Sequence, residues 1–561
     1  MNDMAFKYSK MRKYVNKHYA QKANLKDRRE IKEDNIIELK SPFGLREEFT
    51  RDKDRIIHTK AFRRLQHKAQ VYSNIDGDHY RTRLTHTLEV NQIAKAIARN
   101  IKVNEDLTEA IALGHDIGHT PFGHAGEKVM DEILRGNDDL GHKLKYSLNY
   151  GGFKHNFNSL KILELVEQKY SDSDGLNLTW QVLDGICKHT KIFKENGDKI
   201  WDWTRFVNNS IYFKDIVGYS YPEFIQYNHK MKIGVPLTIE GQIVQLADEI
   251  AQREHDLDDG FRGENGNKFV KLQSIMDHAH KLINSDMGRY NAFIKLKEKL
   301  NLDETVSEIQ NKILIDEDEL DLKWATCIRD IVSYFIIDVS ENSLINIYNS
   351  DKEKSILKVN SGERKYIVEK LVDFSECATI LHKSMELFIE NRIINSYEVN
   401  CFDGKGEYIL RQLFKAYYKN PKQMPQSQLR ILEKMIRKNS KEYGEIMING
   451  KELSSIKFIP SSFEDEINYD DVEKLISALK LEGDDFNSIV IFVNSDFAGY
   501  SDDKKRIYLN SEINNVNCNK MLKHYLENHY AYLYVISNYI SKMTDNYAEK
   551  QYSKLYLKNS M

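Results

Sequence analysis

Apolar residues recur at helical spacing along most of the chain, and polar loops interrupt them. The pattern runs from about residue 41 to 443 and breaks at loops such as SDSDGLN and DDGFRGENGN. Apolar positions three and four residues apart are typical of helices that bury one face. The 561 residues include only seven prolines, so few helix interiors are interrupted. The sequence therefore predicts a mainly helical core over 41–443.

The pattern changes near the C-terminus. EIMINGKEL, SIKFI, SIVIFV and RIYLN are typical of short strands, and DDVEKLISALK between them is typical of a helix. We therefore expect a small α/β insert over 444–518, to which the sequence assigns no purpose. Residues 519–561 regain helical periodicity and are expected to return to the core. Residues 1–40 are basic and compatible with a helix, and fit either an arm that packs on a neighbour or a solvated tail.

Charge and cysteine usage narrow the class of protein. The formal net charge is only −3 although 30% of the residues are charged, so there is no global field for nucleic acid or membrane. Five scattered cysteines form no CxxC pair, which indicates neither a disulfide framework nor a thiolate zinc site. The longest apolar runs, such as IVSYFIID, are too short to span a bilayer, and the first residues lack a signal-type apolar run. We expect a cytoplasmic protein that does not bind membranes.

One short segment concentrates residues that carry chemistry. HDIGHTPFGHAGE, residues 115–127, holds three histidines and two acids around a Gly-Pro-Phe-Gly turn. In the preceding NEDLTEAIALGHD, Asn104 is a suitable N-cap and the apolar residues have helical spacing. His115 and Asp116 are therefore expected at the end of a buried helix.

Two further helices are expected to point polar side chains into the interior. His86 lies four, seven and eleven residues before Val90, Ile93 and Ile97 on a helix from about 83 to 101, so its imidazole should face the core. Asp248 shares a face with Val244 in LTIEGQIVQLADEIAQREHDLDD. A buried carboxylate is costly unless it meets a cation or several hydrogen bonds.

These side chains together predict a metal centre. His86, His115, Asp116 and Asp248 supply two imidazoles and two carboxylates, a set that suits Mn²⁺, Fe²⁺, Zn²⁺ or, less ideally, Mg²⁺. A single inward-facing histidine is usually an ordinary core residue, but the joint set with a contiguous His-Asp pair is not explained in that way. We expect one divalent metal ion with open coordination positions.

Two other groups of residues are weaker candidates. His124 and Glu127 are three residues apart beyond the turn, where the acid either charges the imidazole for proton transfer or caps the next helix. AFRRLQHKAQVY and HYRTRL gather basic side chains before His86, which form either a polyphosphate cradle or a solvated surface: Arg63, Arg64, Lys68, Arg81 and Arg83.

Taken together, these segments closely resemble the deoxyguanosine triphosphate triphosphohydrolase family of the HD-domain superfamily. The resemblance covers roughly 40–440 and the final forty residues, and leaves the strand-rich insert outside it. The matching segments are RDKDRIIHTKAFRRLQHKAQVY, RTRLTHTLEV, GHDIGHTPFGHAGE, GGFKHNFNSLKIL and ADEIAQREHDLDD, with a weaker similarity in NYISKMTDNYA.

The resemblance implies a role for each matching residue. It assigns the metal, usually Mn²⁺ or Mg²⁺, to His86, His115, Asp116 and Asp248, in agreement with the helical pattern. It makes His124 and Glu127 a catalytic dyad and brings His119 close to the α-phosphate. It places Gln70 and the Val71 backbone against deoxyribose and base. The further substrate contacts that it implies are Asn156, Lys188 and the arginines Arg63 and Arg64, which would balance the charge of the tripolyphosphate.

Three positions depart from the family pattern. Gln252 stands where a tyrosine is common four residues after the metal-binding aspartate, which puts an aromatic contact to the substrate in doubt. Asn538 and Asn546 stand where an acid and an arginine are common, which puts nucleotide or inter-subunit contacts there in doubt. The presumed metal ligands and the dyad do not depart.

The resemblance implies hydrolysis of a deoxynucleoside triphosphate (dNTP) at the α-phosphorus to a deoxynucleoside and tripolyphosphate. The alternatives are an HD phosphohydrolase of another nucleotide, and a regulator that binds nucleotide or single-stranded DNA without turnover. The family is typically oligomeric, often hexameric, and some members respond to dNTPs or single-stranded DNA as effectors. The sequence leaves the preferred dNTP, the metal and the effector open.

Overall fold

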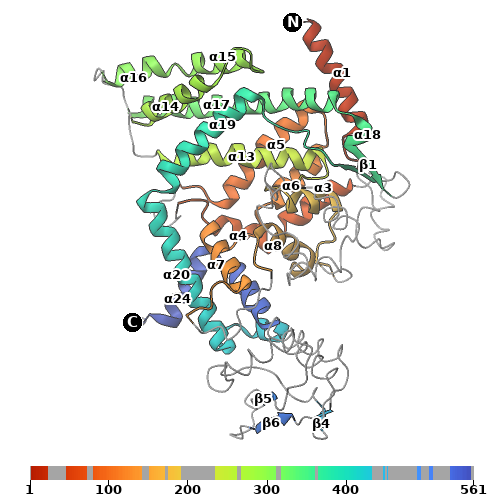
Figure 1. Cartoon of the computed structure of the whole chain (residues 1–561), viewed down its shortest axis with the longest axis vertical. Coiled ribbons are helices and arrows are strands. Elements are labelled where there is room, and N and C mark those ends of the chain that lie inside the picture. The colour runs from red at the N-terminus through yellow and green to blue at the C-terminus, as the bar shows by residue number, and fades with distance from the viewer. Residues whose placement is uncertain are drawn as a thin grey trace, which may run out of the picture. The chain divides into compact units, whose positions relative to one another are not determined.

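The computed structural model is mainly helical (Figure 1), as the sequence predicts. It describes residues 2–22, 46–72, 80–141, 151–170, 175–190, 234–261, 267–310, 317–359, 364–432 and 531–557, together with four short strands between 447 and 509. No helix in these ranges is long and apolar enough to cross a membrane.

Two compact units divide the chain. The first contains 1–123, 154–204 and 212–404, and the second contains 124–153, 205–211 and 405–561.

Helices form most of the first unit. They are α1 (Asn2–His18), α3 (Glu48–Ile57), α4 (Lys60–Arg64), α5 (Arg83–Ile101), α6 (Glu105–Gly114), α8 (His155–Lys161), α9 (Trp180–Cys187), α13 (Ile239–Gly260), α14 (Asn267–Leu282), α15 (Tyr290–Leu300), α16 (Leu302–Gln310), α17 (Glu317–Asn349), α18 (Lys352–Ser355) and α19 (Glu376–Ile389). Three shorter turns of helix belong to the same unit: η3 (Leu65–His67), η4 (Ile162–Val166) and η5 (Glu390–Ile394). The long helix α20 (Tyr397–Lys419) continues from the first unit into the second, and η6 (Pro421–Gln423) belongs to the second unit.

Local sequence explains where the central helices begin. Thr82 and Thr85 form a reciprocal capping box at the start of α5, and the side chain of Asn104 accepts from Leu107 N at the start of α6. Thr238 caps α13 by accepting from Gly241 N. The predicted helix over 83–101 and the predicted N-cap at Asn104 are both confirmed.

The core of the first unit lies where five of these helices pack together. α5 packs against α13, α6 and α17, and α9 packs against α6 and α13. Val90, Ile93 and Ile97 on α5 are fully buried, as the periodicity predicts. Burial of this apolar face against neighbouring helices stabilises α5 more than its intrinsic helix propensity does.

Strands are few in the described chain. β1 (Ile356–Val359) and β2 (Arg364–Ile367) pair antiparallel, with Ile356 opposite Ile367, in a hairpin that the helical pattern did not predict. In the predicted insert, β3 (Met447–Ile448) pairs with β4 (Lys451–Glu452), and β5 (Ile489–Val493) pairs with β6 (Lys505–Leu509). The predicted strand SIKFI and the helix at DDVEKLISALK lie outside the described residues.

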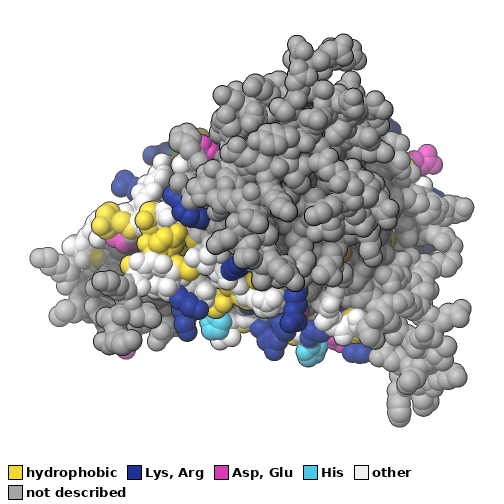
Figure 2. All heavy atoms as spheres, turned by 90° about the horizontal axis from the view of Figure 1, so that it is seen from below, with side chains coloured by type: hydrophobic (Ala, Val, Ile, Leu, Met, Phe, Trp, Pro, Cys, Tyr) yellow, Lys and Arg dark blue, Asp and Glu magenta, His cyan; other side chains and the backbone are white. Residues whose placement is uncertain are grey.

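The second unit contains α7 (Gly123–Arg135, from its second residue) and α24 (Asp545–Tyr556), together with helical residues 531–541. An ion-pair network binds its segments, because Arg411 reaches Glu132, Asp138 and Glu407. Figure 2 shows one face on which Lys and Arg side chains are spread over the described surface, with fewer Asp and Glu side chains.

Candidate metal centre and active site

The end of α6 delivers two neighbouring polar side chains to the interior. Every residue from Leu107 to Leu113 except Glu109 is buried, and the helix ends at Gly114, so His115 and Asp116 follow in a tight turn. The turn lies close against α8, since Gly118 N donates to Ser159 Oγ at 2.9 Å. A side chain at Gly118 would overlap the His155 carbonyl and the Ser159 backbone. Glycine is therefore required for this approach.

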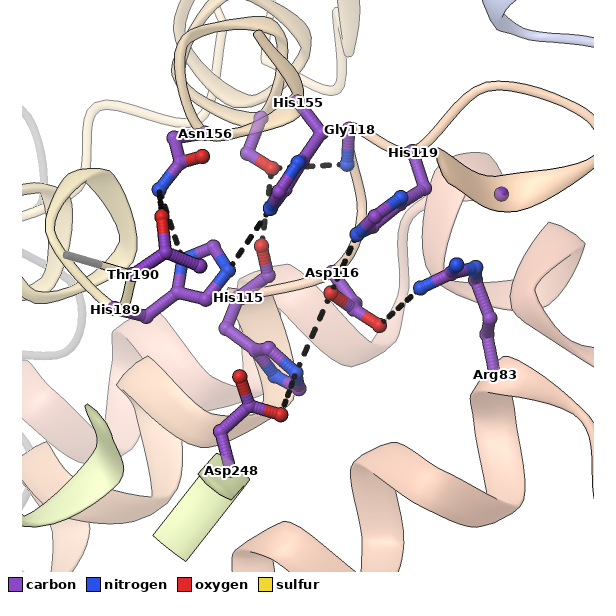
Figure 3. Close-up of polar contacts among 12 residues, drawn as sticks. Arg83, His115, Asp116, Gly118, His119, His155, Asn156, His189, Thr190 and Asp248 are labelled. Carbon is purple, nitrogen blue, oxygen red and sulfur yellow. Dashed lines mark hydrogen bonds and ion pairs between the residues drawn. The ribbon is translucent and has the colours of Figure 1, made fainter. Parts of the chain in front are cut away.

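The four predicted metal ligands meet in the first unit, two of them on α5 and α13 and two in the turn after α6. His86 Nε2 lies 3.0 Å from Asp248 Oδ1 and 4.0 Å from Asp116 Oδ2. His115 Nε2 lies 3.4 Å from Asp116 Oδ1 and 3.7 Å from Asp248 Oδ1. Figure 3 shows His115, Asp116 and Asp248 converging on one point. The two histidines and Asp116 are buried, and Asp248 is partly exposed.

The hydrogen bonds of His115 leave one nitrogen for a ligand. Its Nδ1 lies 2.7 Å from the carbonyl oxygen of Ala112, so Nδ1 carries the proton and donates. Its Nε2 is buried and has no hydrogen-bond partner among the described residues. A buried lone pair that faces two carboxylates fits a divalent cation.

The donor set as a whole also fits one ion. Nitrogen and oxygen donors of His86, His115 and Asp248 all lie within 4.8 Å of one another. Two imidazoles and two carboxylates suit a first-row divalent metal, and four protein donors leave coordination positions open for substrate or water.

Both carboxyl groups of the centre keep their negative charge. Burial by itself raises the pKa of Asp116, but its contacts with His119, His115 and the Arg83 guanidinium outweigh burial and hold that pKa well below its usual value. Burial also opposes ionisation of Asp248, yet the hydrogen bond from His86 lowers the pKa of Asp248 to about 2. The centre therefore offers two anions in a buried place, which attracts a cation.

Neighbouring imidazoles are held neutral. Burial, followed by the charges of Arg83 and His155, lowers the pKa of His119 well below its usual value. Burial, followed by His155 and His115, lowers the pKa of His189 to about 3. These rings can donate or accept hydrogen bonds without adding positive charge beside the metal ligands.

Arg83 contributes a buried cation to the same place. Its Nη1 donates to Asp116 Oδ2 at 2.7 Å, and the side chain is 1% exposed. Its Nε and Nη2 have no hydrogen-bond acceptor among the described residues. Two unsatisfied guanidinium donors next to a metal centre are suited to an anionic oxygen. Sequence reasoning placed Arg83 only in a general basic group.

A row of three histidines extends the site, and the sequence analysis predicted only the first of them, His119. His119 Nε2 lies 3.0 Å from Asp116 Oδ1, and the His119 ring stacks on His155 with centroids 3.8 Å apart. His155 Nε2 lies 3.1 Å from His189 Nε2 (Figure 3). The sequence does contain His155 next to Asn156 in KHN, and His189 next to Lys188 in KHT. The sequence analysis considered only Asn156 and Lys188 in these two segments.

Asp256 is a second residue that sequence reasoning missed. It lies on α13, eight residues after Asp248, and is 1% exposed. Neither carboxyl oxygen has a hydrogen-bond partner among the described residues. Burial raises the pKa of Asp256 to about 7 although the charge of Arg253 lowers it. A buried carboxyl group that has no hydrogen-bond partner among the described residues is suited to bind a hydroxyl group of a ligand.

The predicted sugar-side and phosphate-side residues lie before α5. Gln70 and Val71 are half-buried, and Gln70 Oε1 has no hydrogen-bond partner among the described residues. The neighbouring Ala69 forms a β-bridge with Thr82, which holds this segment at the start of α5. Arg63 is exposed and Arg64 is half-buried at the end of α4.

Asn156 and Lys188 have protein partners already. Asn156 Nδ2 donates to Cys187 O at 2.9 Å and to Thr190 Oγ1 at 3.0 Å, and its Oδ1 has no partner among the described residues. Lys188 is fully buried, and its Nζ lies 2.7 Å from Asp184 Oδ1 and 3.0 Å from Val235 O. A contact between Lys188 and substrate stays a prediction.

The predicted dyad lies in the first turn of α7. His124 is exposed and Glu127 is buried, three residues further along the helix. Both belong to the second compact unit, which begins at His124. Of the positions that depart from the family pattern, Gln252 is half-buried on α13, Asn538 is buried and Asn546 is exposed.

Comparisons with known proteins agree with this centre. The model of the HD domain family matches residues 83–253, the range that contains all four candidate ligands. A deoxyguanosinetriphosphate triphosphohydrolase-like protein of Geobacter metallireducens is 35% identical over 386 residues, 69% of this chain and 81% of that protein. Proteins of the same description from Bartonella quintana (35% over 387 residues, 68% and 80%) and Rickettsia rickettsii (34% over 378 residues, 67% and 80%) are also similar.

The helical core and its buried His and Asp donors are those of an HD-domain, metal-dependent phosphohydrolase. Within that class, the chain belongs to the family of deoxyguanosinetriphosphate triphosphohydrolase-like proteins.

Proposed function

We propose that this protein hydrolyses a deoxynucleoside triphosphate at the α-phosphorus, releasing a deoxynucleoside and tripolyphosphate. The observation that carries the proposal is the buried convergence of His86, His115, Asp116 and Asp248, next to a guanidinium group with unsatisfied donors. Such a group of side chains fits a metal ion next to an anionic phosphate. The names of the relatives favour a deoxynucleoside triphosphate as the substrate.

The four ligands would hold one divalent ion, Mn²⁺ or Mg²⁺. When bound, the ion would polarise an α-phosphate oxygen and make a coordinated water more acidic. His115 presents Nε2 because Ala112 O fixes its Nδ1 proton. Arg83 keeps Asp116 ionised and oriented through Asp116 Oδ2. The chain thus prepares the ligand atoms before the ion arrives.

Substrate contacts follow from the polar groups around the centre. Arg83 and His119 lie beside Asp116, and we assign them to the α-phosphate. Asp256 and Gln70 have buried oxygens without partners among the described residues, and we assign them to the deoxyribose and base. We assign Val71 to the sugar side, and Arg63, Arg64, Asn156 and Lys188 to the remaining substrate contacts.

His124 and Glu127 are proposed to manage the proton. They are three residues apart in the first turn of α7, where a carboxylate raises the basicity of a neighbouring imidazole. The dyad acts either as a base towards water or as an acid towards the leaving 5′-oxygen. General acid–base groups of this kind contribute about 10²–10⁴-fold to a rate.

We also infer a cytoplasmic homo-oligomer, with a hexamer as the first size to test and dNTPs or single-stranded DNA as candidate effectors. Light scattering measures the oligomer, with and without nucleotide. The family resemblance supports these inferences.

A nucleotide panel tests the substrate. Purified protein is incubated with Mn²⁺ and each dNTP or ribonucleotide, alone and with a second dNTP or single-stranded DNA, and products are separated by ion exchange. We expect deoxynucleoside and tripolyphosphate from at least one dNTP, and loss of both products with His124→Ala/Glu127→Ala. Monophosphate and pyrophosphate as products would instead favour hydrolysis between the phosphates. Binding without turnover under every condition would favour a regulatory nucleotide-binding protein.

A further inference from the structure

His86 makes a second contact on the side away from the other metal ligands. Its Nδ1 lies 3.1 Å from Nδ1 of His255, and both rings are buried. The ring centroids are 5.0 Å apart at an interplanar angle of 78°, so the two rings meet edge to face. His255 lies on α13 seven residues after Asp248, about two helical turns along the same face. One helix therefore supplies both a metal ligand and the partner of another metal ligand.

The positions of the protons in this pair follow from the metal centre. If His86 Nε2 binds the ion, it carries no proton, so the proton of a neutral ring lies on Nδ1. His86 Nδ1 must then donate, and His255 Nδ1 must accept. Since His255 accepts at Nδ1, its own proton lies on Nε2. The contact is thus directional, from His86 to His255.

Glu89 lies against His255 on the side away from His86. The carboxylate of Glu89 contacts His255 Nε2, and Glu89 lies on α5 three residues after His86. Arg81 holds Glu89 in turn, because Arg81 Nε lies 3.3 Å from Glu89 Oε2. Arg81 Nη1 also contacts Asp259 at 2.7 Å, which ties the start of α5 to the end of α13. Arg81 therefore holds in place the carboxyl group at the end of this series of contacts.

A second metal ion at these residues is less well supported. Donor atoms of Glu89, Glu254 and His255 do lie within 4.8 Å of one another. However, Arg81 already contacts both carboxylates, with its Nη2 lying 3.5 Å from Glu254 Oε1. The guanidinium supplies the positive charge that an ion would otherwise bring.

We propose that His255 and Glu89 form a hydrogen-bond relay that holds His86 in its metal-binding tautomer and thereby sets the affinity of the centre for its divalent ion. His255 and Glu89 are positioning residues, since they act through His86. The inference rests on the metal centre of the proposed function and is independent of which nucleotide is hydrolysed.

Manganese affinity of the whole protein tests the relay, measured by the electron paramagnetic resonance signal of free Mn²⁺. His255→Phe keeps a ring and removes both nitrogens, whereas His255→Asn restores an acceptor near Nδ1. We expect His255→Phe to weaken Mn²⁺ binding about 10- to 100-fold, as loss of such outer partners does. His255→Asn should recover a large part of that affinity. Unfolding midpoints in EDTA check that each variant is folded.

A matched pair of surface variants provides the control. Glu89 is 37% exposed and Glu105, which pairs with Arg99 at the start of α6, is 38% exposed. We expect Glu89→Ala to weaken Mn²⁺ binding several-fold and Glu105→Ala to leave it unchanged. If His255→Phe does not fold, this pair decides the question, and equal affinities of the two variants would overturn the relay.

A spectroscopic readout separates tautomer control from general packing. In Co²⁺-loaded protein, the Nδ1–H proton of His86 gives a hyperfine-shifted NMR signal that exchanges slowly while it is hydrogen-bonded. We expect this signal in the wild type and His255→Asn, and rapid exchange of it in His255→Phe. Wild-type affinity in His255→Phe, or two bound Mn²⁺ ions of which Glu89→Ala loses one, would overturn the proposal. Absence of Mn²⁺ binding in the wild type would instead overturn the metal centre itself.

Discussion

At the scale of single residues, the centre consists of buried charges whose partners are fixed by close packing. Gly118 is the residue that lets the His115–Asp116 turn approach α8. A Cβ atom there would lie 2.1 Å from His155 O and 2.3 Å from Ser159 N, and both are backbone atoms with little freedom to move. A larger residue at position 118 would therefore displace backbone atoms of the site itself.

The first prediction concerns this glycine. Gly118→Ala should destabilise the protein by about 1–3 kcal/mol or more and reduce turnover, because the turn or α8 must shift. Gly288→Ala is the matched control, since a Cβ there meets nothing within 4 Å. Thermal unfolding and steady-state kinetics of the two variants are the measurements. Equal stability of the two variants would contradict the close contact between the turn and α8.

The pattern of single residues predicted which way the candidate metal ligands face, but not which residues surround them. His86 and Asp248 were predicted to face the core because helical periodicity fixes their direction, and the structure brings them within 3.0 Å. His155 and His189 were missed because their meeting depends on how α8 and the end of α9 cross, and a local period carries no such information. Asp256 was missed because it lies in DLDD, and an acidic segment of this kind is typical of a solvent-exposed helix end.

At the scale of elements, Glu240 connects three parts of the first unit. It lies in the first turn of α13, and its Oε1 accepts from Gln21 N beyond α1 and from Asn104 N at the start of α6, both at 3.0 Å. Burial raises the pKa of Glu240 to about 7 although these two backbone hydrogen bonds lower it.

The second prediction follows from that raised pKa. Between the unfolded value of 4.5 and about 7, the folded protein keeps a proton that the unfolded chain has lost. The contribution of Glu240 to stability is therefore greatest below the unfolded pKa and is lost as pH rises through 7. Glu240→Gln keeps the acceptor and does not ionise, so it should be more stable than the wild type near pH 8, by on the order of 1–3 kcal/mol.

Urea unfolding near pH 5 and near pH 8 measures this difference, which should be small at the lower pH. The control is Glu105→Gln, because the hydrogen bond from Arg99 lowers the pKa of Glu105 and removes any trend of the same sign. An advantage of Glu240→Gln that is as large near pH 5 as near pH 8 would contradict the raised pKa.

The boundaries of the central helices were predictable and the small hairpin was not. α5 and α6 begin where Thr82 and Asn104 cap them, and capping depends on a few adjacent residues. β1 and β2 are four residues each, and Tyr366 on β2 is buried against Trp180, with ring centroids 4.8 Å apart. A tertiary contact of this kind decides the conformation of a segment too short to show a period.

At the scale of the whole molecule, the four candidate ligands all belong to the first compact unit, whereas the strand-rich insert belongs to the second. The third prediction is that a chain without 444–518 binds Mn²⁺ with the affinity of the full chain, because no ligand is removed. Titration of both proteins by the free-Mn²⁺ signal is the measurement. Loss of metal binding from a truncated protein that remains folded would mean that the insert is part of the core.

The identity of the reaction is also a property of the whole molecule. A sequence pattern alone predicts a metal centre, and many nucleotide hydrolases have the same ligands. Membership of the family restricts the chemistry to phosphohydrolysis, while the bond that is broken must be measured.

The measurement that tests the account most directly is hydrolysis of dGTP and the other dNTPs with Mn²⁺ in H₂¹⁸O, with mass spectrometry of the products. Attack of water on the α-phosphorus puts one ¹⁸O atom into tripolyphosphate and none into the deoxynucleoside, and Asp116→Asn should abolish both products. Label in a nucleoside monophosphate or diphosphate, or labelled tripolyphosphate formed equally fast by Asp116→Asn, would contradict it.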